Sequence, residues 1–419
     1  METSYHSREE HSMGHAGDRG SEIGTTADRE QEPATADGKR EPATVDGKRE
    51  PATADVMQNP ATTGGEQQPI TLVEVRKRAW SQLKGICTVN KVCDGDPSRF
   101  CMGQKYGEAL GLGSVGKGLS FTANVKALDR ITLKTRLISE HVPPDLSTTI
   151  FGQKIALPVM PSSVSGVLPS LGGCMREQEF ARAILAGSHA AGTLGWIGNT
   201  CDTGQEVTGV DAVRHSGKGI PIFKPQANSR LLELIRMAAD AGATAVGVDL
   251  DGVGSTNWER MGKPVFRKSP RELAELVDST SLPFIAKGIM CPEDALLALD
   301  AGVAGIDVSN HGGRALGSTR GVADVLPRIV NAIRDARRGD TVTITAGGGV
   351  RTGFDVMKLI ALGADAVLIG RDIIRAAVGG GARGVELHFD YLRSEITRGM
   401  LLTSTNSIGD INDRIIEYH

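Results

Sequence analysis

The sequence predicts an α/β protein whose main domain is a closed (β/α)8 barrel, or TIM barrel, preceded by a disordered tail. Short apolar runs that suit strands buried on both faces recur eight times after residue 150. Stretches with helical spacing separate them. Eight such units match a barrel better than an open doubly wound sheet, which stays the alternative because sequence patterns do not show closure. The expected strands are 156–160, 193–197, 220–223, 245–250, 282–286, 305–308, 342–345 and 366–369.

The segments between these runs carry helix signals. Apolar residues fall at the i, i+3, i+4 and i+7 spacing of one helical face in 231–238, and the same spacing begins in 356–360. Several segments end in a glycine before the next strand, as at Gly242, Gly302 and Gly363. A glycine suits the left-handed residue that follows a helix, so each marks an expected helix end.

Residues 1–69 are expected to be disordered. Tyr5 is the only aromatic residue in this segment and large aliphatic residues are few, so it cannot bury enough apolar surface to offset its ordering entropy. The segment contains a nine-residue repeat, EPATADGKR at 32–40 and then EPATVDGKR at 41–49. Because this period is shorter than that of stacking repeats, it indicates a solvated tail that grew by duplication, with partner binding as the alternative.

Residues 70–419 are assigned to a single barrel domain. An amphipathic run at 70–83 leads into a Gly- and Cys-rich stretch at 85–120, which serves as an N-terminal extension. Three cysteines of this stretch have a spacing that is not a standard zinc or iron–sulfur pattern, so we expect reduced thiols and no metal. A metal or redox role is the alternative. The three are Cys87, Cys93 and Cys101.

Charge and composition exclude several classes of partner. Residues 1–69 hold 7 Lys+Arg and 14 Asp+Glu, a net −7, and the other 40 Lys+Arg and 36 Asp+Glu give the remainder +4. A body this close to neutral predicts no nucleic-acid partner, since such binding needs many phosphate contacts. No run of 18 apolar residues predicts a membrane span. Six cysteines do not form a disulfide scaffold, and no secretory signal is visible, so we expect a cytoplasmic protein.

The last two expected strands are each followed by residues that suit a phosphate group. Gly348, Gly349 and Arg351 follow the seventh strand, and Gly370 and Arg371 follow the eighth. Glycines let the backbone approach an anion closely, amide groups at a helix start point at it, and arginines add forked charged donors. These two loops are also the recurrent phosphate site of the barrel fold, so the sequence predicts a phosphorylated ligand here.

Ionisable residues follow strands four, five and six. Asp249 ends the fourth strand, Lys287 ends the fifth, and His311 and Arg314 follow the sixth. A histidine at such a strand end is suited to act as a general base because it titrates near neutrality. Asp249 could orient this imidazole, Arg314 could hold a substrate carboxylate, and Lys287 could face a group that becomes anionic. The carboxyl ends of barrel strands meet at one rim, so these side chains are expected to converge there.

Three segments resemble the FMN-dependent 2-hydroxy acid dehydrogenases and oxidases, which include glycolate, lactate and mandelate oxidisers. SNHGGR at 309–314, GGVR at 348–351 and LIGR at 368–371 form a highly specific combination. The resemblance covers roughly residues 120–410, is weaker in the first half, and looks closest to a bacterial subgroup of 2-hydroxy-acid-oxidising proteins. It implies FMN as cofactor, oxidation of a small 2-hydroxy acid to a 2-oxo acid, O2 or a redox carrier as the final acceptor, and a homo-oligomer, a tetramer in the family.

The resemblance also implies roles for individual residues. His311 matches the catalytic base and Asp249 the aspartate paired with it. Arg314 matches the arginine that binds the substrate carboxylate, and Lys287 the lysine beside flavin N1 and O2. Flavin N5 would receive the electrons, by a hydride or a carbanion route that the sequence does not separate. The residues that match flavin or phosphate contacts are Ser163, Ser165, Lys224, Lys287, Ser309, Gly348, Gly349, Arg351, Gly370 and Arg371.

The chain departs from the family pattern mainly around the substrate. Gln226 stands where the family has a tyrosine after the third strand, and is expected to face the substrate; Lys224 replaces a glutamine. The second substrate arginine has no match in 251–257, where Arg260 is the nearest stand-in, and the family's N-terminal active-site tyrosine is not found. Gly347 replaces the aspartate that opens the strand-seven glycines. The flavin site therefore looks retained, while the substrate pocket looks rebuilt.

Two other functions remain open at this point. One is an FMN-dependent isomerase like type 2 isopentenyl diphosphate isomerase, which shares the barrel and the phosphate site. Arg314 argues against it because an arginine there suits a carboxylate. The other is a flavin-binding protein without turnover, which the missing tyrosines keep open.

Overall fold

The computed structural model describes residues 70–83, 119–336 and 342–419. These residues belong to one compact unit, Gln67–His419. The predicted disordered tail with its repeats lies outside the described residues, and so do the three cysteines of the N-terminal extension, Cys87, Cys93 and Cys101.

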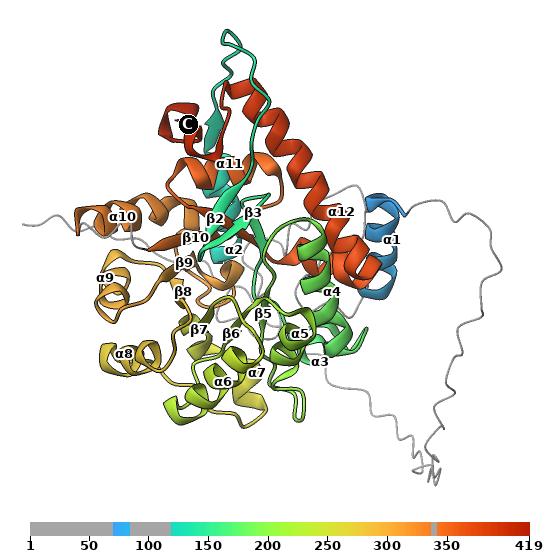
Figure 1. The fold of residues 1–419 in the computed structure, drawn as a ribbon, viewed down its shortest axis with the longest axis vertical. Coiled ribbons are helices and arrows are strands. Elements are labelled where there is room, and N and C mark those ends of the chain that lie inside the picture. Colours follow the sequence, from blue (N-terminus) through green and yellow to red (C-terminus); the bar gives the residue numbers. More distant parts are fainter. Residues whose placement is uncertain (1–69, 84–118, 337–341) are drawn as a thin grey trace, which may run out of the picture. The chain divides into compact units, whose positions relative to one another are not determined.

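Eight parallel strands form the centre of the described part of the chain (Figure 1). They lie in the order β4-β11-β10-β9-β8-β7-β6-β5, so strands that are consecutive in the chain are neighbours from β5 to β11. This order is that of a barrel in which a helical connection follows each strand. The strands are β4 (Val159–Pro161), β5 (Trp196–Gly198), β6 (Ile220–Phe223), β7 (Val246–Asp249), β8 (Phe284–Ile289), β9 (Gly305–Ser309), β10 (Thr343–Gly347) and β11 (Ala366–Ile369).

Each of the two edge strands, β4 and β5, bonds to the segment that flanks the other strand, and these bonds close the ring. Thr193 Oγ1, ahead of β5, donates to the carbonyl of Val159 in β4 over 2.7 Å. The amide of Gly198, the last residue of β5, donates to the carbonyl of Val164, after β4, over 3.3 Å. The sheet is therefore a (β/α)8 barrel, as the sequence predicts, and the open doubly wound sheet is excluded.

All eight predicted strands are confirmed, although the first two begin three residues later than expected. Pro158 has no N–H to donate to a neighbouring strand. The amide of Ala156 donates to Gly192 O, outside the sheet. The glycines predicted to end helices are left-handed as expected, with φ of 82° at Gly242, 88° at Gly302 and 104° at Gly363.

Helices surround the strands, and further elements cover the ends of the barrel (Figure 1). The predicted amphipathic run forms a helix ahead of the barrel. The helices are α1 (Leu72–Leu83), α2 (Leu119–Asp129), α3 (Val167–Leu171), α4 (Glu177–Ala190), α5 (Thr208–Ser216), α6 (Asn228–Asp240), α7 (Thr256–Arg260), α8 (Pro270–Asp278), α9 (Pro292–Asp300), α10 (Val322–Asp335), α11 (Gly353–Ala361) and α12 (Arg371–Thr403). The 3-10 turns are η1 (Leu250–Gly254), η2 (His311–Gly313), η3 (Ile408–Asp410) and η4 (Asp413–Ile415). Two small antiparallel sheets pair β1 (Ile131–Leu133) with β12 (Ile416–Tyr418) and β2 (Thr148–Ile150) with β3 (Gln153–Ile155).

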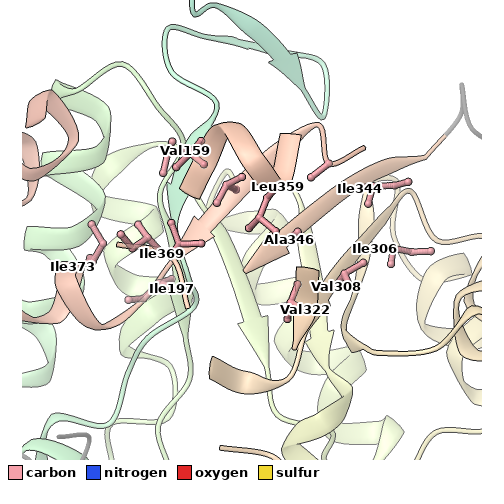
Figure 2. Packing of buried hydrophobic residues seen from close by; sticks show 14 of the residues in the cluster. Val159, Ile197, Ile306, Val308, Val322, Ile344, Ala346, Leu359, Ile369 and Ile373 are labelled. Atoms are coloured by element: carbon pink, nitrogen blue, oxygen red, sulfur yellow. The ribbon is translucent and has the colours of Figure 1, made fainter. Parts of the chain in front are cut away.

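The strands are buried on both faces, and their side chains alternate between two apolar clusters. Trp196 and Leu368 belong to the cluster that includes Ile150 and Phe151 from the β2–β3 hairpin. The neighbouring Ile197, like Ile369, belongs to the larger cluster between strands and helices, shown in Figure 2. This period of two is that of a strand covered on both sides, and explains why the strands are continuous apolar runs in the sequence.

Helix α1 packs on α12, the last helix of the barrel. Gly379 and Gly384 allow the close approach: a Cβ at Gly379 would lie 2.0 Å from the carbonyl oxygen of Val75. α12 is kinked at Gly381, where φ is 57° and ψ is −145°. None of the helices in the described ranges is long and apolar enough to cross a bilayer.

Candidate active site

A cavity opens at the carboxyl ends of the strands, where the active site of a (β/α)8 barrel lies. The structure brings twelve of the fourteen predicted site residues to its wall. Asp249 is not in the wall but contacts two lysines that are. Gln226 is not in the wall, and neither is Arg260, which is exposed. The twelve are Ser163, Ser165, Lys224, Lys287, Ser309, His311, Arg314, Gly348, Gly349, Arg351, Gly370 and Arg371.

One side of the cavity, which we call the phosphate side, consists of residues 347–351, Gly370 and Arg371. The guanidinium carbons of Arg351 and Arg371 lie 5.2 and 4.3 Å from the ring centroid of Phe121, in α2. Arg351 also donates to the carbonyl of Gly349, and Arg371 to the carbonyl of Gly312 over 2.8 Å. The aromatic ring and the carbonyl oxygens hold both cations at one place. An anion such as a phosphate would meet them there.

Helix α2 supports this side from behind, through a residue that sequence analysis missed. The side-chain amides of Asn124 and Asn310 bond to each other in both directions, over 2.8 and 3.0 Å. A Cβ on Gly348 would lie 3.0 Å from Asn124 Nδ2, and one on Gly349 would lie 2.9 Å from its carbonyl carbon. The two glycines are thus required by the close approach of α2 as well as by a ligand, and Gly349 has a positive φ of 81°.

A second group of residues, which we call the substrate side, consists of three residues of the wall, Lys224, Lys287 and His311, and the two carboxylates that contact them, Asp249 and Asp251. Asp249 is buried at the end of β7 and accepts from the ammonium groups of Lys224, in the loop after β6, and Lys287 of β8; the second distance is 2.8 Å. Burial raises the pKa of the Asp249 carboxyl, but the two ammonium groups outweigh burial and hold this pKa well below its usual value. Burial lowers the pKa of Lys287, and the Asp249 carboxylate outweighs it and raises the pKa above the ordinary value. Lys287 is therefore held charged at the cavity wall.

His311 begins the turn after β9 with a positive φ of 57°, an uncommon conformation for a residue with a side chain. Its Nδ1 lies 2.9 Å from Asp251 Oδ1 and 3.4 Å from Asp249 Oδ2. We expected Asp249 to be the partner of this imidazole, yet the shorter contact is with Asp251. The two oxygens of Asp249 accept instead from Lys224 and Lys287.

A further buried carboxyl, Asp307, lies in β9 and was missed by sequence analysis. It is fully buried and accepts from Ser309 Oγ over 2.6 Å and from Thr345 Oγ1 over 3.0 Å. Lys287 Nζ is 3.9 Å away. Burial outweighs these three neighbours and raises the pKa of Asp307 to about 6. An acidic residue inside a strand buried on both faces is the sequence signal that could have revealed it.

Asn199 is a second missed residue of the cavity wall, in the segment that follows β5. It is 5% exposed, and its Oδ1 accepts from the amide of Lys224 over 2.9 Å, which fixes the orientation of the side-chain amide. The Nδ2 group is buried and has no hydrogen-bond partner among the described residues. Since an unmade hydrogen bond of a buried donor is costly, this group is suited to a ligand acceptor atom.

The segment between β7 and α8 covers part of the cavity. Trp258 of α7 is 3% exposed and lines the wall together with Asn257, whose Nδ2 donates to Ser170 Oγ over 3.3 Å. The salt bridge between Lys263 and Glu206, at 2.5 Å, joins this segment to the loop after β5. Where the family has its second substrate arginine, this chain therefore has an aromatic wall and a segment held in place by a salt bridge.

The residues of the cavity fit a flavin mononucleotide. The phosphate side offers glycine backbone and two guanidinium groups for a phosphate, and Lys287 offers a buried cation for a polarised ring oxygen. The orphaned Nδ2 of Asn199 offers one more donor. This donor set matches a ligand with an anionic end and a flat heterocycle rich in acceptors.

Comparison with known proteins identifies the class. The sequence matches the FMN-dependent dehydrogenase family over residues 111–271 and 255–418. L-lactate dehydrogenase of Caulobacter vibrioides is 30% identical over 354 residues, covering 70% of this chain and 88% of that one. Glycolate oxidase of Spinacia oleracea is 28% identical over 331 residues, covering 69% and 85%. A solved structure of mandelate oxidase with (S)-2-phenylpropionate has a TM-score of 0.64 at 26% identity, covering 84% of this chain and 99% of that one.

The fold and the site together define a flavin-dependent barrel oxidoreductase. This chain belongs to the FMN-dependent dehydrogenase family, and its cofactor is FMN.

Proposed function

We propose that the protein oxidises a 2-hydroxy acid to a 2-oxo acid with FMN as the electron acceptor. The observation that carries the proposal is that His311, Arg314 and Lys287 line the same cavity as the phosphate side. This combination offers a base, a carboxylate-binding cation and a flavin-facing cation at one rim. The relatives named as lactate, glycolate and mandelate enzymes support the substrate class, and the family match favours oxidation over the isomerase alternative.

The residues assigned to FMN fall in two groups. Gly348, Gly349, Arg351, Gly370 and Arg371 would hold the phosphate through backbone amides and guanidinium groups. The residues that would hold the ring system are Ser163, Ser165, Lys224, Lys287 and Ser309, with Asn199 added from its unpaired amide. When bound, FMN supplies a two-electron acceptor at N5, and the protein supplies orientation and charge.

The remaining residues act on the substrate. Arg314 would bind the substrate carboxylate through its planar guanidinium, which fixes the 2-carbon and its hydroxyl in the cavity. His311 would accept a proton from the substrate at Nε2, because Nδ1 faces the carboxylates of Asp249 and Asp251. Trp258 gives the cavity an apolar wall, which suits a side chain at the 2-carbon. O2 or a redox carrier would then reoxidise the cofactor.

The test is the absorption spectrum of the FMN-loaded protein, recorded without oxygen before and after adding glycolate, lactate, mandelate and longer 2-hydroxy acids. We expect at least one acid to bleach the flavin. The His311→Ala variant should keep FMN and bleach at least about 100-fold more slowly, since general base catalysis contributes about that much. If no 2-hydroxy acid bleaches the FMN-loaded protein, the proposal is wrong, and the remaining interpretation is a flavin-binding protein without turnover.

We also infer a homo-oligomer, a tetramer by analogy with the family. Support comes from the apolar side chains of Leu137 and Ile138, which are 65% and 103% exposed, beside Leu402, which is 49% exposed. The amide of Arg136 donates to the carbonyl of Leu402 over 2.8 Å, so these segments are adjacent. Ile138→Asp should reduce the mass measured by sedimentation if this surface joins subunits.

The cytoplasm is the compartment that we propose from composition, although a relative in Arabidopsis thaliana is named peroxisomal.

A further inference from the structure

We propose that Asp251, rather than Asp249, is the residue that positions His311 as a base in this protein. The proposal rests on the oxidation proposed above and concerns how this chain performs it. Asp251 Oδ1 lies 2.9 Å from His311 Nδ1, whereas Asp249 Oδ2 is 3.4 Å away. Of the two carboxylates, Asp251 therefore makes the shorter contact with the imidazole, at a distance typical of a hydrogen bond.

The carboxylate of Asp249 already accepts hydrogen bonds from two lysines. Its Oδ1 accepts from Lys287 over 2.8 Å, and its Oδ2 accepts from Lys224. The two ammonium groups already compensate the charge of the Asp249 carboxylate, so less of that charge is left to stabilise a positive imidazole nearby.

Asp251 is differently placed, because its charge faces the imidazole. Oδ1 is the atom that contacts His311, and Oδ2 is buried and has no hydrogen-bond partner within the described part of the chain. The side chain of Asp251 is 10% exposed, so the interaction is only weakly screened by water. When His311 accepts a proton, the positive charge that forms on its ring lies beside this carboxylate.

Local backbone geometry holds Asp251 at this position. The residue lies in η1, directly after β7, and its side chain packs on Gly288, where β8 has a bulge. Gly288 has a positive φ of 94°, and a Cβ there would lie 2.7 Å from Asp251 Cγ. A side chain at this position of β8 would therefore displace the carboxylate, so Gly288 and Asp251 act as a matched pair.

The consequence for catalysis concerns the tautomer of the imidazole. An Nδ1–H that donates to Asp251 leaves Nε2 without a proton, which is the form that can act as a base. Charged groups near this ring are Asp249 of β7, Asp251 of η1, and the two lysines that contact Asp249, Lys224 and Lys287. Arg371 donates to Gly312 O, next to His311. Of the two carboxylates, Asp251 is the closer to Nδ1.

The same three residues could be suspected of holding a metal. Candidate ligand atoms of Asp249, Asp251 and His311 lie within 4.8 Å of one another. However, the ammonium groups of Lys224 and Lys287 contact Asp249 directly, and a divalent cation would have to displace or face them. The contacts therefore favour a hydrogen-bonded base over a metal ligand.

The experiment measures the tautomer of His311 by 15N NMR of the FMN-loaded, histidine-labelled protein, with His311→Gln used for assignment. The variants are Asp251→Asn, Asp249→Asn, the conservative Asp251→Glu, and Asp278→Asn, an exposed carboxylate on α8, as the matched control. We expect the wild type, Asp278→Asn and Asp249→Asn to keep the proton on Nδ1. Asp251→Asn should lose this preference, and Asp251→Glu should restore part of it.

A second readout is the rate of flavin bleaching by whichever 2-hydroxy acid is active. Asp251→Asn should slow bleaching by about 100-fold with little change in substrate affinity, as for a base held in the wrong tautomer. A tautomer preference lost in Asp249→Asn and kept in Asp251→Asn would overturn the assignment. If Asp249→Asn does not fold, an unchanged tautomer of His311 in Asp251→Asn is by itself enough to overturn the assignment. If no acid bleaches the wild type, the proposed function fails, yet the NMR comparison still decides between the two carboxylates.

Discussion

The two sides of the cavity are built from different interactions. On the phosphate side, Arg351 and Arg371 contact the ring of Phe121 and backbone carbonyls. On the substrate side, the residues hold one another by charge, with Asp249 between Lys224 and Lys287. The phosphate side thus places two cations beside an aromatic ring and backbone carbonyls, whereas the substrate side depends on the balance of charges buried together.

This difference has an energetic consequence. A residue of the phosphate side contributes mainly when its anionic ligand is bound, so its loss should be seen as weaker FMN binding. A residue of the buried charge cluster contributes even in the empty protein, because its partner is left uncompensated when it is removed. Stability measurements and FMN titrations therefore separate the two sides.

The largest expected effect is the loss of stability in Lys287→Met. Lys287 is 2% exposed. Its removal leaves Asp249 with a single ammonium partner, and it takes away the ammonium group that lies 3.9 Å from the Asp307 carboxyl. Breaking a buried pair in this way costs about 3–5 kcal/mol, to be measured by urea unfolding of the FMN-free protein. Lys263→Met, which removes the partly exposed partner of Glu206, is the matched control and should cost less than about 1 kcal/mol. Equal losses in the two variants would mean that the cluster is not held by charge.

The next effect is a change in how stability depends on pH in Asp307→Asn. Burial raises the pKa of Asp307 to about 6 in the folded protein, against an unfolded value of about 3.9. Between pH 4 and pH 6 the unfolded chain therefore releases this proton more readily, so this residue makes the wild type lose stability as the pH rises. Asparagine stays neutral, and the variant should gain up to about 3 kcal/mol relative to the wild type over this window.

The measurement is the urea unfolding free energy of both FMN-free proteins from pH 4 to pH 7. Asp278→Asn is again the matched control, because its carboxylate is exposed, and it should show a constant difference from the wild type. A difference between Asp307→Asn and the wild type that does not change with pH would show that Asp307 titrates in the folded protein as it does in the unfolded chain.

On the phosphate side, Arg351→Ala should leave the fold intact and weaken FMN binding by about 10- to 100-fold, the usual cost of losing hydrogen bonds to a charged group. Phe121→Leu should weaken it by less, since it removes only the ring over which the two guanidinium groups lie. Quenching of FMN fluorescence on titration gives both affinities. Arg260→Ala, an exposed arginine outside the cavity, should bind FMN like the wild type. An Arg351→Ala protein that binds as tightly would contradict the phosphate assignment.

The same comparison explains what could be predicted from the sequence. The barrel, its eight strands and the phosphate side are visible because their signals are local: apolar runs, and glycines next to arginines. Phe121 and Asn124 were not foreseen, since nothing in the sequence links α2 to Asn310, nearly two hundred residues later. Asp251 was missed for another reason: whether it or Asp249 faces His311 depends on the turn of η1 and on the lysines that β6 and β8 bring.

The smallest expected effect is that of Gln226→Ala, which tests whether this side chain faces the substrate, as the family pattern implies, or lies outside the cavity wall. Gln226 stands where the family has a tyrosine, and its carbonyl accepts from Lys268 over 2.5 Å, while its side chain is not part of the cavity wall. Gln226→Ala should therefore change the substrate concentration for half-maximal bleaching by no more than about twofold, as for a surface substitution. Arg314→Ala, in the wall, should raise it by far more. If Gln226→Ala raised it by more than about tenfold, equal to about 1.4 kcal/mol, the loop after β6 would have to turn this amide into the cavity when substrate binds.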